Sequence, residues 1–224
     1  MDINLAFGSV EINPTVLNGF LLVLFLSLFF IYAGNKVKKA DPSQPSRGVV
    51  LFLEILVTSI NGLIVSTMGK HNLSFAPFVG TLTVFILTAN LLGLLGFAPP
   101  TSDYNVTLAL AIFTIVMMYG QGARVDGFWK TLKGTVLGDF PALAPLNIIG
   151  EISKPISLSV RLFGNIMSGG IILGLVYSAL SWAAPLVAPF LHIYFDVFAG
   201  LVQTLIFIML TMIWTEGMTS APEE

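Results

Sequence analysis

The chain has no cysteine and only two histidines, His71 and His192, among its 224 residues. Without cysteine there is no disulfide, no thiolate metal site and no cysteine nucleophile. Two histidines are too few for a histidine metal cluster, and no glycine-rich phosphate loop of the G-x-x-x-x-G-K-[ST] kind is present. We therefore predict no cofactor, metal, nucleotide or nucleic acid as a ligand of this chain, and no catalytic residue.

Charge is also scarce. Only 10% of the residues are charged, against about 25% in soluble domains, whereas 55% are hydrophobic and the mean hydropathy is +0.90. The solvent for most of this chain must be lipid. The sequence thus predicts an all-α, polytopic membrane protein that forms a single membrane domain over 1–224. Membrane spans are expected at about 16–34, 75–98 and 106–120, and the N-terminus shows no cleaved signal peptide.

The ten basic residues predict the topology, because cytoplasmic loops carry an excess of Lys and Arg. The first span is followed by a basic stretch over 35–47, which places the N-terminus outside. The loop 99–105 has no Lys or Arg, whereas 122–133 contains Arg124, Lys130 and Lys133. The first of these loops is expected outside, and the second loop and the C-terminus in the cytoplasm.

The segment 48–70 is apolar enough to span, but a crossing there would invert every later loop. We therefore interpret it as an interfacial or re-entrant helix. Glu54, Thr58 and Asn61 recur along one helical face, as such a helix requires. An ordinary span with a buried carboxylate remains the alternative.

The segment 145–182 is too long for an upright span. A helix from about 145 to 178 is roughly 51 Å long, so in a hydrocarbon core of about 30 Å it must tilt strongly or break, with Pro155 as a candidate kink. With the final apolar segment, 187–216, it is expected to form a hairpin of two long slanted helices.

Arg161 lies inside this segment, where a guanidinium costs at least about 2.5–3.5 kcal/mol. Glu151, Lys154 and Asn165 share its helical face. Glu151 and Lys154 have the spacing of an ion pair, but no acid lies one or two turns beyond Arg161. Arg161 must therefore meet a carboxylate from elsewhere in this chain or from another chain, and a role in moving ions is the interpretation that we favour.

The last helix carries a second polar stripe of His192, Asp196, Gly200 and Gln203, within about 80° of arc. Histidine titrates near neutral pH and burial raises the pKa of a carboxylate, so such a pair is suited to relaying protons. The alternatives are a histidine at the membrane interface and an aspartate capped by a neighbouring helix.

One motif carries a resemblance. The run Ser157–Ile166 after Lys154-Pro155 closely resembles the signature of subunit a of F-type ATP synthases. The similarity extends to Asn90–Leu94, Gln203 and Ile206–Thr211, and covers roughly residues 16–216. It implies a non-catalytic stator in the plasma membrane of a bacterium that passes H⁺ or Na⁺ through two offset half-channels. The implied partners are the c-ring proteolipids, the peripheral-stalk b subunits and the rest of the ATP synthase.

The resemblance also implies residue roles. Arg161 matches the arginine that faces the c-ring carboxylate and prevents leak, and Asn165 and Gln203 match polar positions beside it. Glu151 lies where acids of the cytoplasmic half-channel occur in many relatives. Where many relatives have a glutamate nine residues after the arginine, this chain has Gly170, and it has Asp196 where a histidine is common. The acid of the outer half-channel is therefore expected to have moved to Asp196.

A second class of function is a self-contained secondary transporter that binds an anionic substrate at Arg161. The absence of internal repeats and of a pair of broken helices favours the stator over this alternative.

Overall fold

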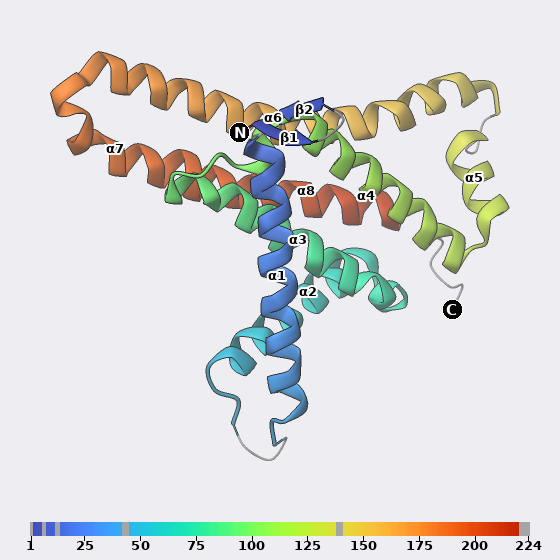
Figure 1. The fold of residues 1–224 in the computed structure, drawn as a ribbon. Helices are drawn as coiled ribbons and strands as arrows, with labels where there is room; N and C mark the ends of the chain where they lie inside the picture. The colour runs from blue at the N-terminus through green and yellow to red at the C-terminus, as the bar shows by residue number, and fades with distance from the viewer. Residues whose placement is uncertain (1, 6–7, 12–13, 42–44, 138–140, 220–224) are drawn as a thin grey trace.

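A computed structural model describes residues 2–5, 8–11, 14–41, 45–137 and 141–219. After a short antiparallel hairpin, in which β1 (Asp2–Leu5) pairs with β2 (Gly8–Glu11), the described chain is helical (Figure 1). The sequence analysis did not anticipate this hairpin. Five helical segments are long and apolar enough to cross a membrane: Pro14–Lys38, Val49–Met68, Lys70–Leu95, Tyr104–Val125 and Ala144–Glu216. The chain is therefore a helical multi-span membrane protein.

The first half of the chain forms α1 (Pro14–Lys38), α2 (Val49–Met68) and α3 (Ala76–Leu91). A 3₁₀ turn, η1 (Lys70–Phe75), joins α2 to α3, and a second one, η2 (Leu92–Leu95), follows α3. In Figure 1, α1 runs across the long C-terminal helices rather than along them.

A third 3₁₀ turn, η3 (Pro100–Ser102), precedes α4 (Tyr104–Val125), and the carboxylate of Asp103 caps this helix by accepting a hydrogen bond from the Asn105 backbone N–H at 2.9 Å. The next helix, α5 (Phe128–Leu137), lies in a segment that the sequence analysis treated only as a basic loop. It was missed because it is short and mixes lysines with apolar residues. Its exposed face carries Trp129, which is 71% exposed, and Lys133.

The C-terminal half is a long hairpin. After the turn η4 (Pro141–Leu143), helix α6 (Ala144–Leu180) runs for 37 residues and continues through Pro155. It returns through η5 (Ser181–Ala183), α7 (Ala184–His192), the π-helical segment η6 (Ile193–Phe198) and α8 (Ala199–Glu216). Figure 1 shows α6 and the α7–α8 arm side by side and running in opposite directions. The last helix, predicted as a continuous segment over 187–216, thus begins earlier and contains a wide turn.

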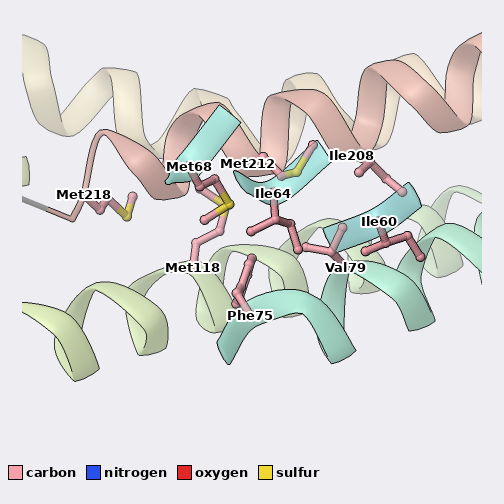
Figure 2. Packing of buried hydrophobic residues seen from close by; sticks show 9 residues of the cluster. All are labelled: Ile60, Ile64, Met68, Phe75, Val79, Met118, Ile208, Met212 and Met218. Carbon is pink, nitrogen blue, oxygen red and sulfur yellow. The ribbon is translucent and has the colours of Figure 1, made fainter. Parts of the chain in front are cut away.

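Two apolar clusters hold the helices together. The first, shown in Figure 2, joins α2, η1, α3, α4 and α8 through Ile60, Ile64, Met68, Phe75, Val79, Met118, Ile208, Met212 and Met218. The second joins α3, α4, α6 and α8 through Leu82, Ile86, Ala111, Leu158, Leu162 and Phe207. Leu158 and Leu162 are almost fully buried, and they set the rotation of α6 about its axis.

Candidate ion pathway

The rotation of α6 determines where Arg161 points. Its neighbour Leu162 is fully buried against the core, and successive helical residues are about 100° apart, so Arg161 lies on the outer edge of the helix. The arginine is exposed, and it makes no hydrogen bond or ion pair with any residue that the structure describes. Its charge is therefore directed away from the chain that carries it.

Two side-chain amides with buried NH₂ groups lie on α6 and α8, the two helices that face each other. Asn165 lies on α6, one turn beyond Arg161, and Gln203 lies on α8, 6% exposed. The Nδ2 of Asn165 and the Nε2 of Gln203 are buried without a hydrogen-bond acceptor among the described residues. Leaving a buried donor unpaired costs about 1–3 kcal/mol, so a purely structural role for these two amides is poorly supported.

A chain of three protonatable groups lies farther along the hairpin. The Tyr177 hydroxyl on α6 is 2.6 Å from Nε2 of His192, and Nδ1 of His192 is 2.5 Å from a carboxylate oxygen of Asp196. The three side chains thus connect α6 to α7 and the π-helical turn. Each member both accepts and releases protons, so the arrangement is chemically able to pass a proton along its length.

The backbone around Asp196 is unusual. Asp196 lies inside the π-helical turn Ile193–Phe198, and such turns are frequently found at functional sites. Pro189, which precedes the turn within α7, has no N–H to donate to a regular helix. Gly93 of η2 lies against this turn, since a Cβ on Gly93 would come within 3.3 Å of the Asp196 carboxylate carbon. The glycine therefore lets η2 approach the acid closely, and a side chain at residue 93 would force the Asp196 carboxylate to shift.

A second polar cluster lies near the other end of α6. Glu151 accepts a hydrogen bond from the Tyr119 hydroxyl of α4 at 3.0 Å and pairs with Lys154 at 2.5 Å. The Lys154 ammonium also lies 5.7 Å from the ring centre of Trp214 on α8. The Glu151–Lys154 ion pair expected from the sequence is therefore present. Lys154 neutralises Glu151, and Arg161 takes no part in this pair.

The six predicted residues therefore occupy three zones of the hairpin. His192 and Asp196 are in direct contact, Glu151 lies in a separate cluster, and Arg161, Asn165 and Gln203 belong to the helix segments between them. Sequence reasoning missed Tyr177 and Tyr119. Neither tyrosine has a local signal, because each acquires its partner only when α6 packs beside α7 and α4. Within the described ranges, no group of three His, Cys, Asp or Glu residues is placed to hold a metal ion.

Fold and site together define a multi-span membrane protein with ionisable groups spaced along a long helical hairpin. The family model described as "ATP synthase A chain" matches residues 16–216, and the chain belongs to this family. It is 35% identical over 216 residues to ATP synthase subunit a of Trichlorobacter lovleyi, with 95% of this chain and 90% of the relative covered. It is 32% identical over 223 residues to the "ATP synthase subunit a, sodium ion specific" of Propionigenium modestum, with 92% and 74% covered.

These relationships give the general role of the chain. It is a non-catalytic membrane component of an ATP synthase, the ion-translocating stator subunit a, which works with the other subunits of that complex. Membership of this family speaks against the self-contained anion transporter that the sequence left open.

Proposed function

We propose that the chain forms two offset half-channels for H⁺ or Na⁺ that meet at Arg161. The outer half-channel passes Asp196 and His192, and the cytoplasmic one passes Glu151. Asn165 and Gln203 line the region between them. The partners at Arg161 are the carboxylates of the c-ring proteolipids, and the peripheral-stalk b subunits hold the chain in place.

The observation that carries this proposal is the exposed, unpaired guanidinium on the outer edge of α6. A permanently charged group inside an apolar helix needs a counter-charge, and the described part of the chain supplies none. A carboxylate on a moving partner satisfies this requirement. Arg161 stabilises the ionised carboxylate as it passes and blocks a direct path between the two half-channels.

We further propose that the N-terminus lies outside a bacterial plasma membrane and that the C-terminus lies in the cytoplasm. The distribution of Lys and Arg supports this orientation. The Asp196 cluster then lies toward the outer side, and the Glu151 cluster toward the cytoplasm, since α6 begins after the basic segment 122–133.

The test is the substitution Arg161→Ala in the complete ATP synthase. We expect ATP synthesis and ATP-driven ion pumping in vesicles to be abolished, while the enzyme still assembles, because the exposed side chain contributes no packing to the core. Arg161→Lys should restore little activity, since an ammonium is a point charge that loses its proton more readily when buried. Near-normal coupled synthesis by Arg161→Ala would refute the assignment.

A further inference from the structure

A long apolar groove of about 1200 Å³ lies between α1, α2 and α3, away from the residues assigned to the ion pathway. This volume exceeds the roughly 300–1,000 Å³ of sites for small molecules. The walls are built mainly from aliphatic and aromatic side chains, among them Leu26 and Phe30 of α1, Val57 and Ile60 of α2, and Val84 and Phe85 of α3. The groove therefore suits hydrocarbon chains.

The polar groups of the groove narrow the choice of ligand. The two charged side chains that line it, Lys38 at the end of α1 and Glu54 in the second turn of α2, have opposite sign. Both are exposed, and neither makes an ion pair or hydrogen bond with any residue in the described part of the chain. Lys38 is the last residue of α1, and Glu54 lies near the start of α2, the next helix. The end of α1 and the start of α2 are joined by a short connection, so both side chains lie toward the same end of the groove.

We propose that this groove binds one membrane phospholipid with a phosphoethanolamine headgroup. The acyl chains lie along the apolar walls, the phosphate meets the Lys38 ammonium, and the headgroup ammonium meets the Glu54 carboxylate. An anionic headgroup such as phosphatidylglycerol would pair its phosphate with Lys38, but it has no cationic group to pair with Glu54. A zwitterionic headgroup pairs both side chains through charge-assisted hydrogen bonds.

The glycines of α1 and α2 provide a matched pair of blocking variants. Gly34 lines the groove, and a Cβ at this position meets no atom within 4 Å, so a side chain can start from this position without steric conflict. Gly62 on α2 has the same free space but does not line the groove. Gly34→Phe therefore fills the lipid site, and Gly62→Phe is its control.

The experiment uses the complete ATP synthase, incubated with vesicles of equal parts phosphatidylethanolamine and phosphatidylglycerol and then examined by native mass spectrometry. We expect one retained phosphatidylethanolamine per copy of this chain, lost in Gly34→Phe and kept in Gly62→Phe. Lys38→Gln should weaken the retention of phosphatidylethanolamine roughly tenfold, because it removes one charge-assisted contact. For the same reason, Glu54→Gln should reduce the preference for phosphatidylethanolamine over phosphatidylglycerol by about tenfold. Lys39→Gln, outside the groove lining, should do neither.

Three outcomes would overturn the proposal. One is equal retention by Gly34→Phe and Gly62→Phe, and another is a preference for phosphatidylglycerol in the unmodified enzyme. The third concerns Thr81, which lines the groove and is exposed. A benzophenone attached at Thr81→Cys should cross-link to lipid in the intact enzyme, and cross-linking to another subunit instead would show that a partner helix fills the groove.

Discussion

At the residue scale, the position of each ionisable group depends on the burial of its neighbours. Arg161 is exposed because Leu158 and Leu162 occupy the buried face of α6. Asp196 is only partly exposed, and its carboxylate is already hydrogen-bonded to His192. These two residues therefore differ in what they offer a partner: Arg161 a free charge, and Asp196 one end of a hydrogen-bonded chain.

Asp196→Asn keeps the size and much of the hydrogen bonding but removes the titratable group. We expect ion flux, measured as ATP-driven pumping in vesicles, to fall by about a hundredfold or more, since a positioned proton-transferring group typically contributes roughly 10²–10⁴-fold. The double variant Asp196→Asn with Gly170→Glu should recover part of the flux. A Cβ at Gly170 meets no atom within 4 Å, so a side chain can start from this position without steric conflict. Unchanged flux and pH dependence in Asp196→Asn would make Asp196 a structural contact only.

Tyr177→Phe tests the chain that ends at Asp196. The variant keeps the aromatic ring beside His192 but removes the hydroxyl that contacts its Nε2. We expect ATP synthesis to slow by roughly two- to tenfold, as one hydrogen bond is lost, and its pH profile to shift. Tyr194→Phe is the control, because the Tyr194 ring stacks on Phe198, whereas His192 is hydrogen-bonded to Tyr177 and Asp196. Equal rates and pH profiles for the two variants would exclude Tyr177 from the pathway.

At the scale of elements, the turn η1 bears on the membrane position of α2. Asn72 of η1 accepts a hydrogen bond from Gln121 of α4 at 2.9 Å, and Gln121 lies three residues before Arg124. The Lys/Arg distribution predicts that this end of α4 is cytoplasmic. Helix α2 starts after the basic segment 35–47 and ends next to η1, so this contact favours the interfacial or re-entrant interpretation over an ordinary span.

Single cysteines test this topology, and the chain has no native cysteine to interfere. Arg47 and Lys70 are exposed near the two ends of α2, and both Arg47→Cys and Lys70→Cys should react with an impermeant maleimide from the cytoplasmic side. Lys133→Cys should react from the same side, and Asn105→Cys from the outside. Labelling of positions 47 and 70 from opposite faces would show that α2 crosses the membrane.

At the scale of the whole molecule, a buried polar network connects Thr219, which follows α8, to the first half of the chain. The Asn72 amide donates to the Met68 carbonyl oxygen and to the Thr219 hydroxyl, each at 3.0 Å, and its oxygen accepts from Gln121. Thr219 is 147 residues from Asn72 in sequence. In addition to the apolar cluster of Figure 2, this polar network joins α2, η1, α4 and the residues after α8.

Gln121→Ala should lower the stability of the chain without touching the ion pathway. Gln121 is 2% exposed, and its loss leaves the buried Asn72 oxygen without this donor, at a cost of about 1–3 kcal/mol. We expect a lower melting temperature for the purified enzyme and normal pumping below that temperature. Asn105→Ala, at an exposed position, should leave the melting temperature unchanged. If both variants have the same melting temperature as the unmodified enzyme, the network does not contribute to stability.

The sequence by itself determined the helical membrane class, the long hairpin and the motif around Arg161. Hydropathy, length and a charge that lipid penalises are properties of the chain that need no tertiary contact. The extension of α6 through Pro155 depended on its neighbours, because helices packed alongside can accommodate the lost hydrogen bond.

Tertiary structure alone decided which partners the ionisable groups have on other helices. The pairs Tyr177–His192 and Tyr119–Glu151 join residues 15 and 32 positions apart, and the π-helical turn at Asp196 lies where η2 and α6 pack against it. The exposed side of Arg161 likewise follows from which face of α6 is buried. No local pattern encodes these features, since each depends on the distance between helices that are set in place by distant apolar contacts.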